Sequence, residues 1–138
     1  MNIMPSIKRS EKELKSLYED FHKHPEIGFQ ENRTSAIVAK KLNDYGADLI
    51  DVGLGKTGVV GIVEGRFPGN RCVALRADMD ALPIKETSGV AFTSETPGVM
   101  HACGHDAHTT MLLGAAKYLA ETREFAGRAM LVFQPAEE

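Results

Sequence analysis

The chain has 138 residues, of which 43% are hydrophobic and 25% charged, the composition of one ordinary globular domain. Its net charge of −3 provides no basic surface for nucleic acid or for an anionic membrane, so neither is expected as a partner. No apolar run approaches the ~20 residues that span a bilayer. Two cysteines are too few for a disulfide framework, so a reducing cytoplasm is the expected location.

The first third of the chain predicts two helices. Ser10 followed by Glu13 is a capping-box pattern at the start of the first helix, and Pro25 closes that segment. A second helix is expected over residues 33–45, where apolar residues recur at helical spacing. Gly46 directly follows it and suits a left-handed cap.

Three short runs rich in β-forming residues follow the second helix. They cover residues 48–52, 58–64 and 72–77, and the Gly/Pro/Asn-rich stretch 65–70 predicts a turn between the last two. The pattern is irregular over residues 78–105. A loop of that length is uncommon in a compact domain unless it is functional.

The end of the chain predicts a crossover unit. A helix is expected over about residues 106–122, followed by a buried strand over residues 129–134. A strand, a helix and a second strand in this order favour parallel neighbouring strands. The sequence therefore predicts an α/β fold, with strand 72–77 beside strand 129–134.

This topology gathers reactive side chains at one edge of the sheet. Two aspartates follow the first strand of the unit, two glutamates follow the second, and a cysteine and a histidine precede the connecting helix. Ligands of open α/β sheets bind at this edge. The residues expected there are Asp78, Asp80, Cys103, His105, Glu137 and Glu138.

The chemistry of this set favours a transition metal. Cys103, His105 and a carboxylate such as Glu138 offer sulfur, nitrogen and oxygen, which suit Zn²⁺, Co²⁺, Mn²⁺ or Ni²⁺ better than Ca²⁺ or Mg²⁺. When only one of two adjacent glutamates points at a metal, the other can act as general base toward water. Asp80 could accept the second ring N–H of a ligand histidine. The set predicts metal-dependent amide hydrolysis.

Two other interpretations remain open. Cys103 could be the nucleophile of a cysteine hydrolase with a nearby histidine as base, although Cys103 and His105 are too close in sequence to align readily for proton transfer. The chain could instead be an inactive truncated fragment that binds metal or docks onto a partner chain. Strand 129–134 would then present an unpaired apolar edge, and the chain would self-associate.

The remaining histidines and the other cysteine have less specific expectations. His22 and His24 precede Pro25 at a helix end, where capping of helix carbonyls is as plausible as a catalytic role. His101 and His108 are expected beside the metal or facing the substrate rather than as ligands, and plain structural hydrogen bonding is as plausible for them. The other cysteine, Cys72, is expected in the core.

Four segments carry a resemblance to a known family. They are HKHPEIGF at 22–29, LRADMDALP at 75–83, MHACGHDAH at 100–108 and QPAEE at 134–138. In order and spacing they resemble the amidohydrolase branch of the aminoacylase/carboxypeptidase metallohydrolase family. That branch includes hippurate hydrolases and indole-acetyl-amino-acid hydrolases, and the chain looks nearest to the hippurate hydrolases. The resemblance covers essentially the whole chain.

The resemblance implies a fold and a site. The fold is a three-layer, zinc-peptidase-like α/β catalytic domain with helices on both faces of the sheet, of which residues 1–138 are the N-terminal part. The site holds two divalent transition-metal ions (Zn, Mn, Co or Ni), with Cys103, His105 and Glu138 as ligands. Glu137 is implied as general base and Asp80 as the orienting carboxylate. Asp78 stands where related peptidases carry a ligand histidine, and it is not counted as a ligand.

The resemblance also implies a reaction. The expected substrate is a small N-acyl or N-aroyl amino acid, similar to hippurate, whose amide bond is hydrolysed. Family members carry further ligand histidines downstream and an inserted lid domain used in dimerisation, so the full-length form is expected to be a homo-oligomer. Because this chain lacks the lid and the C-terminal part, it is expected to be inactive in isolation.

Overall fold

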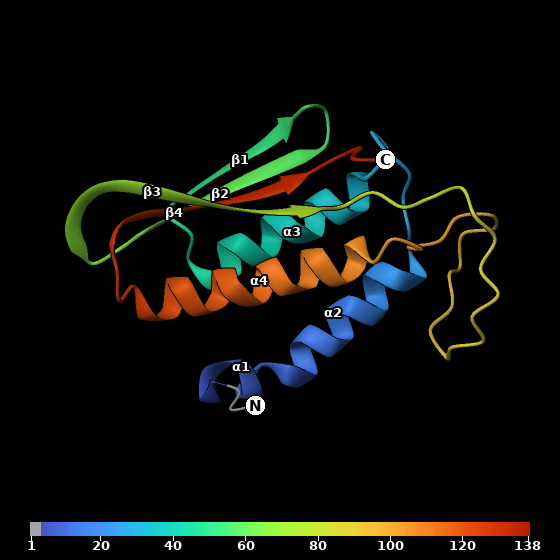
Figure 1. Ribbon diagram of the computed structural model, residues 1–138, viewed down its shortest axis with the longest axis horizontal. Helices are drawn as coiled ribbons and strands as arrows, with labels where there is room; N and C mark the ends of the chain where they lie inside the picture. The colour runs from blue at the N-terminus through green and yellow to red at the C-terminus, as the bar shows by residue number, and fades with distance from the viewer. Residues whose placement is uncertain (1–3) are drawn as a thin grey trace.

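The computed structural model describes residues 4–138 as a mixed α/β fold, in which helices lie on one side of a four-stranded sheet (Figure 1). The predicted fold class is confirmed. Of the two helix layers implied by the resemblance, the described residues supply one. The elements in chain order are α1 (Pro5–Arg9), α2 (Glu11–Lys23), α3 (Asn32–Tyr45), β1 (Leu49–Leu54), β2 (Gly58–Glu64), β3 (Phe67–Asp78), α4 (His105–Thr122) and β4 (Ala126–Gln134).

The strands are ordered β1-β2-β4-β3 in the sheet. β3 and β4 pair in parallel with α4 between them in the chain, so the predicted crossover unit is confirmed. β2 pairs antiparallel with both β1 and β4. The expectation that strand 129–134 presents an unpaired edge is wrong, because β2 and β3 flank β4. Within residues 4–138 the edge strands are β1 and β3.

The core lies between the sheet and the helices α3 and α4. Val59 and Val63 of β2 and Leu131 of β4 are completely buried, and they alternate with more exposed neighbours as the two-residue strand period requires. Leu42 of α3 packs onto the same face. A Cβ atom at Gly61 would lie 2.9 Å from a methyl carbon of Leu42, so glycine allows α3 to approach β2 closely.

Two local predictions differ from the structure. Ser10 precedes α2, but its hydroxyl donates a 3.3 Å hydrogen bond back to Ser6 O of the short helix α1, so no capping box forms. Strand β3 begins at Phe67 and takes up much of the predicted turn at 65–70. Because β3 is an edge strand, Cys72 is exposed rather than buried in the core.

The long loop between β3 and α4 is irregular, as predicted, but its two ends are tied together. Leu82 and Met100 form an antiparallel bridge, with backbone hydrogen bonds of 3.0 Å in both directions. The segment that follows Asp80 is therefore held beside the segment that precedes Cys103. Gly46, which follows the last residue of α3, has the predicted left-handed conformation, with φ of 86°. No helix within residues 4–138 is both long and apolar enough to cross a membrane.

Candidate metal centre

The predicted site residues meet at the carboxyl edge of β3 and β4. Asp78 ends β3, and Asp80 follows it at the start of the long loop. His105 opens α4, and Glu137 lies just beyond the end of β4. One ligand atom from each of His105, Glu137 and Glu138 can be chosen so that all three lie within 4.8 Å of one another. The structure therefore gathers side chains that the sequence placed at one sheet edge by topology alone.

His105 is held in a defined orientation by Asp80. The imidazole is 4% exposed, and its Nδ1 lies 2.9 Å from the Asp80 carbonyl oxygen and 3.1 Å from Asp80 Oδ1. Because both partners only accept hydrogen bonds, Nδ1 carries the proton. Nε2 then presents its lone pair, and it lies 3.9 Å from Glu137 Oε2. This is the arrangement in which a carboxylate prepares a histidine for a metal ion.

The chain after β4 is also fixed by buried carboxylates. The backbone N–H of Glu138 donates a 2.9 Å hydrogen bond to Asp80 Oδ2. Two residues earlier, the N–H of Ala136 donates at 2.9 Å to Glu31 Oε1. Glu31 is fully buried and also accepts a 2.6 Å hydrogen bond from the Thr57 hydroxyl. The sequence contains no signal for Glu31. Its link to the site is the contact with Ala136, which lies 105 residues further along the chain.

Cys103 lies beside the same carboxylates. Its thiol is exposed, and the neighbouring Glu138 side chain raises the pKa of the thiol above its ordinary value. Reactive cysteines need the opposite shift, which an adjacent imidazole normally provides. Within residues 4–138, Cys103 is not part of the group in which ligand atoms of His105, Glu137 and Glu138 lie within 4.8 Å of one another. The raised pKa thus speaks against a nucleophilic role for Cys103.

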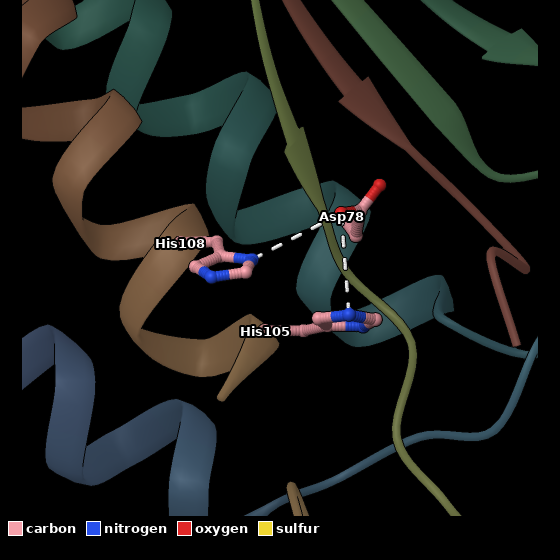
Figure 2. A group of neighbouring side chains, drawn as sticks. All are labelled: Asp78, His105 and His108. Atoms are coloured by element: carbon pink, nitrogen blue, oxygen red, sulfur yellow. Dashed lines mark ion pairs between the residues drawn. The ribbon is translucent and has the colours of Figure 1, made fainter. Parts of the chain in front are cut away.

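A second group of possible ligands lies next to the first. Figure 2 shows Asp78 at the end of β3, with His105 and His108 of α4 beside it. Asp78 Oδ2 is 3.9 Å from His105 Nε2 and 3.9 Å from His108 Nδ1. Arg76 Nη2, however, lies 2.6 Å from Asp78 Oδ1. That cation already balances the Asp78 carboxylate, so the group with Glu137 and Glu138 is the better site for a cation.

The donor types fit a divalent transition metal. The available atoms are the free Nε2 of His105 and the carboxylates of Glu137 and Glu138, with the thiol of Cys103 near Glu138. A mixed sulfur, nitrogen and oxygen set of this kind suits Zn²⁺ and its neighbours in the first transition row. Two of these residues are exposed carboxylates, so a metal could be reached from solvent.

The other histidines occupy different environments. His101 is 5% exposed, and neither ring nitrogen has a hydrogen-bond partner within residues 4–138. Burial is the largest cause that lowers the pKa of His101 to about 4, so its ring is neutral. His24 Nδ1 lies 2.8 Å from Asp20 O and caps the end of α2, one of the two roles expected for it. His22 instead contacts two carboxylates from distant parts of the chain.

Comparison with known proteins agrees with this geometry. Residues 74–138 match the model of Peptidase family M20/M25/M40. Over its whole length the chain is 46% identical to the hippurate hydrolase of Campylobacter jejuni and covers 35% of that protein. It is 43% identical over 126 residues to the N-acetylcysteine deacetylase of Bacillus subtilis, an alignment that covers 91% of this chain and 33% of that protein.

A solved structure supports the same conclusion. The Bacillus subtilis YXEP protein, a dinuclear metal-binding peptidase of the M20 family, matches 94% of this chain with a TM-score of 0.88 and 40% identity. The match covers 36% of the YXEP chain. This chain thus spans about a third of the length of the relatives it matches. The resemblance predicted from the sequence is confirmed, and the chain carries a domain of peptidase family M20/M25/M40.

Proposed function

We propose that the chain carries the metal-binding part of a hydrolase that cleaves the amide bond of small N-acyl or N-aroyl amino acids. The main observation is the approach of His105, Glu137 and Glu138 to within 4.8 Å at the sheet edge. The substrate class is supported by the names of two relatives, a hippurate hydrolase and an N-acetylcysteine deacetylase. Both names describe removal of an acyl group from the nitrogen of an amino acid.

The proposed ligands are Cys103, His105 and Glu138, in a site for two divalent ions. The pairing of ions is supported by the dinuclear YXEP relative. Zn²⁺, Mn²⁺, Co²⁺ and Ni²⁺ all suit the donor types, and cellular supply decides among them. A divalent ion at this position supplies Lewis acidity toward a carbonyl oxygen and toward water.

Glu137 is proposed as the general base. Its side chain is 43% exposed, and Oε2 lies 3.9 Å from His105 Nε2, so the carboxylate borders the site and can reach water there. Glu137 takes a proton from the water while the water oxygen bonds to the carbonyl carbon of the substrate. The same proton then passes to the departing nitrogen as the C–N bond breaks, which leaves a carboxylic acid and a free amino acid. Asp80 keeps His105 in the correct tautomer throughout.

The proposal extends to the surroundings of the site. We expect residues 1–138 to be the N-terminal part of the catalytic domain, since the chain covers only 35% of the hippurate hydrolase. We expect the full-length protein to form homo-oligomers and the 138-residue chain alone to be inactive. The free thiols of Cys72 and Cys103, both exposed, are consistent with a reducing cytoplasm.

A chelation experiment tests the proposed function. Release of glycine from hippurate by the full-length protein should stop after EDTA treatment and return when Zn²⁺, Mn²⁺ or Co²⁺ is added. Cys103→Ala and Glu138→Ala should lower the metal content, whereas Cys72→Ala, which removes the other exposed thiol, should not. Activity that survives EDTA but is abolished by iodoacetamide would instead support the cysteine-hydrolase alternative with Cys103 as nucleophile.

A further inference from the structure

We propose that His22 is a positioning residue that fastens the loop between β3 and α4 to the first turn of α4, and thereby positions the proposed ligands Cys103 and His105 where the loop meets α4. The contact consists of Asp106, His22 and Glu86 and is called the Asp106–His22–Glu86 bridge below. The inference rests on the proposed metal centre, but it concerns residues outside the ligand set.

The bridge joins three separate segments of the chain. His22 belongs to the last turn of α2 and is 6% exposed. Its Nδ1 lies 2.6 Å from Asp106 Oδ2, and its Nε2 lies 3.0 Å from Glu86 Oε1. Asp106 is in the first turn of α4, and Glu86 is in the loop. The side chains of Asp106 and Glu86 are 2% and 5% exposed, so water is largely excluded from both contacts.

The chemistry of the bridge requires a charged histidine. Ionised carboxylates only accept hydrogen bonds, so both ring nitrogens of His22 must donate, and only the imidazolium can do this. Burial by itself would lower the pKa of His22, but the hydrogen bonds to Glu86 and Asp106 outweigh it and raise the pKa. Charge-assisted hydrogen bonds of this kind are among the strongest in proteins, and they fix direction as well as distance.

Glu86 is itself held firmly by its own loop. The backbone N–H of Ser94 donates a 2.5 Å hydrogen bond to Glu86 Oε2, and the hydroxyl of Ser88 donates to Oε1. These donors, together with His22, lower the pKa of Glu86 to about 2. Glu86 therefore connects residues inside the loop to His22 of α2.

Aromatic packing reinforces the attachment. The imidazole of His22 meets the ring of Phe92, a loop residue, edge-on at 5.3 Å between centroids. Tyr18 of α2 contacts both rings, at 5.9 Å from His22 and 5.6 Å from Phe92. The N–H of Glu95 adds a 2.7 Å hydrogen bond to Lys23 O. The end of α2 thus holds the loop through charge, ring contacts and backbone.

The bridge reaches the proposed ligands through short, stiff connections. Asp106 follows His105 directly, and its Oδ1 accepts a 2.8 Å hydrogen bond from the N–H of Ala107, which locks the first turn of α4. The loop end that contains Cys103 is tied to the other end at Leu82 and Met100. His22 contacts no ligand atom itself. Its effect on the site passes through Asp106 and Glu86, and loss of such outer contacts typically weakens metal binding ~10–100-fold.

Co²⁺ binding to the full-length protein tests this inference. Coordination by a thiolate gives Co²⁺ a charge-transfer absorption that reports on Cys103, and competition with a chelator gives the affinity. His22→Gln should weaken Co²⁺ binding ~10–100-fold and reduce or shift this absorption. It should also speed tryptic cleavage after the exposed Lys85. The matched control is His24→Gln, two positions away. The partly exposed ring of His24 lies 3.5 Å from the exposed Glu95 carboxylate of the loop, so this variant should change both measurements far less than His22→Gln.

The outcomes separate the bridge from the metal centre. Equal Co²⁺ affinity, absorption and cleavage in His22→Gln and His24→Gln would overturn the bridge and leave the proposed function intact. A protein that binds no Co²⁺ before any substitution would overturn both. If His22→Gln does not fold, Glu86→Gln carries the same test. It keeps the size of the side chain but removes its charge, and it should weaken Co²⁺ binding in the same direction by a smaller factor.

Discussion

The Asp80 carboxylate accepts a 2.9 Å hydrogen bond from the backbone N–H of Glu138, 58 residues further along the chain. Its other oxygen lies 3.1 Å from Nδ1 of His105. One buried side chain therefore positions the backbone of one proposed ligand and the ring of another. Asp80 is 1% exposed, so neither contact has to compete with solvent.

Asp80→Asn should weaken metal binding ~10–100-fold. The amide replaces one of the two acceptor oxygens with an NH₂ donor, so one of the two contacts must be lost. Calorimetric titration of the metal-free protein measures the effect. The control is Asp78→Asn, because Asp78 is already paired with Arg76. If Asp78→Asn weakened binding more than Asp80→Asn, the metal would lie instead in the group formed by Asp78, His105 and His108.

Glu137→Gln should lower kcat ~10²–10⁴-fold without changing metal content. The amide keeps the shape of the side chain but cannot accept a proton from water. Elemental analysis and turnover of hippurate by the full-length protein provide the two measurements. The neighbouring Glu138→Gln serves as comparison, and it should lose metal as well as activity. Loss of metal in Glu137→Gln with retention in Glu138→Gln would reverse the assignment of the two glutamates.

The sequence predicted which edge of the sheet carries the site, because the order of strands and helices along the chain determines that edge. A strand, a helix and a second strand in succession give parallel neighbours, and β3 and β4 are parallel. Asp78 and Glu137 therefore had to emerge on the same side as the start of α4. This inference needed no knowledge of side-chain contacts. The carboxyl ends of β3 and β4 agree with those predicted to within one residue, whereas the two strands begin five and three residues earlier than predicted.

Features that depend on long-range partners could not be predicted. The Glu31 carboxylate binds the backbone before Glu137 only because the folded chain brings residue 136 to it. Likewise, the local pattern at Ser10 and Glu13 matched a capping box, but Glu13 has stronger partners elsewhere. The position of β4 inside the sheet depends on antiparallel pairing with β2, which hydrophobic periodicity does not specify.

Glu13 should make the free energy of unfolding depend on pH in the acidic range. Burial opposes its ionisation, but hydrogen bonds from Lys117, Lys41 and Tyr45 lower its pKa to about 2 from an ordinary 4.5. The contribution is therefore fully present above about pH 4.5 and is lost as the pH falls through about 2. Glu13→Gln should reduce the free energy of unfolding by ~1–2 kcal/mol near neutral pH, as for other hydrogen bonds to charged groups.

Urea denaturation over a pH series measures this contribution. The difference between the wild type and Glu13→Gln should shrink as the pH falls from about 4.5 toward about 2. Glu11→Gln is the control, since Glu11 is an exposed carboxylate in the same first turn of α2. A difference that stayed constant over this range would show that Glu13 stabilises the fold by packing and not by its charge.

Self-association of the 138-residue chain should occur through β3. Within residues 4–138, β3 is an edge strand of 12 residues, and it exposes Val73 by 61%. Such an edge offers unpaired backbone groups beside apolar side chains, and a charge placed there blocks pairing between molecules. Val73→Lys should therefore lower the association measured by light scattering, with little effect on unfolding. Met111→Lys, at a 63% exposed position on α4, is the matched control. If both variants reduced association equally, exposed apolar area would drive it rather than strand pairing.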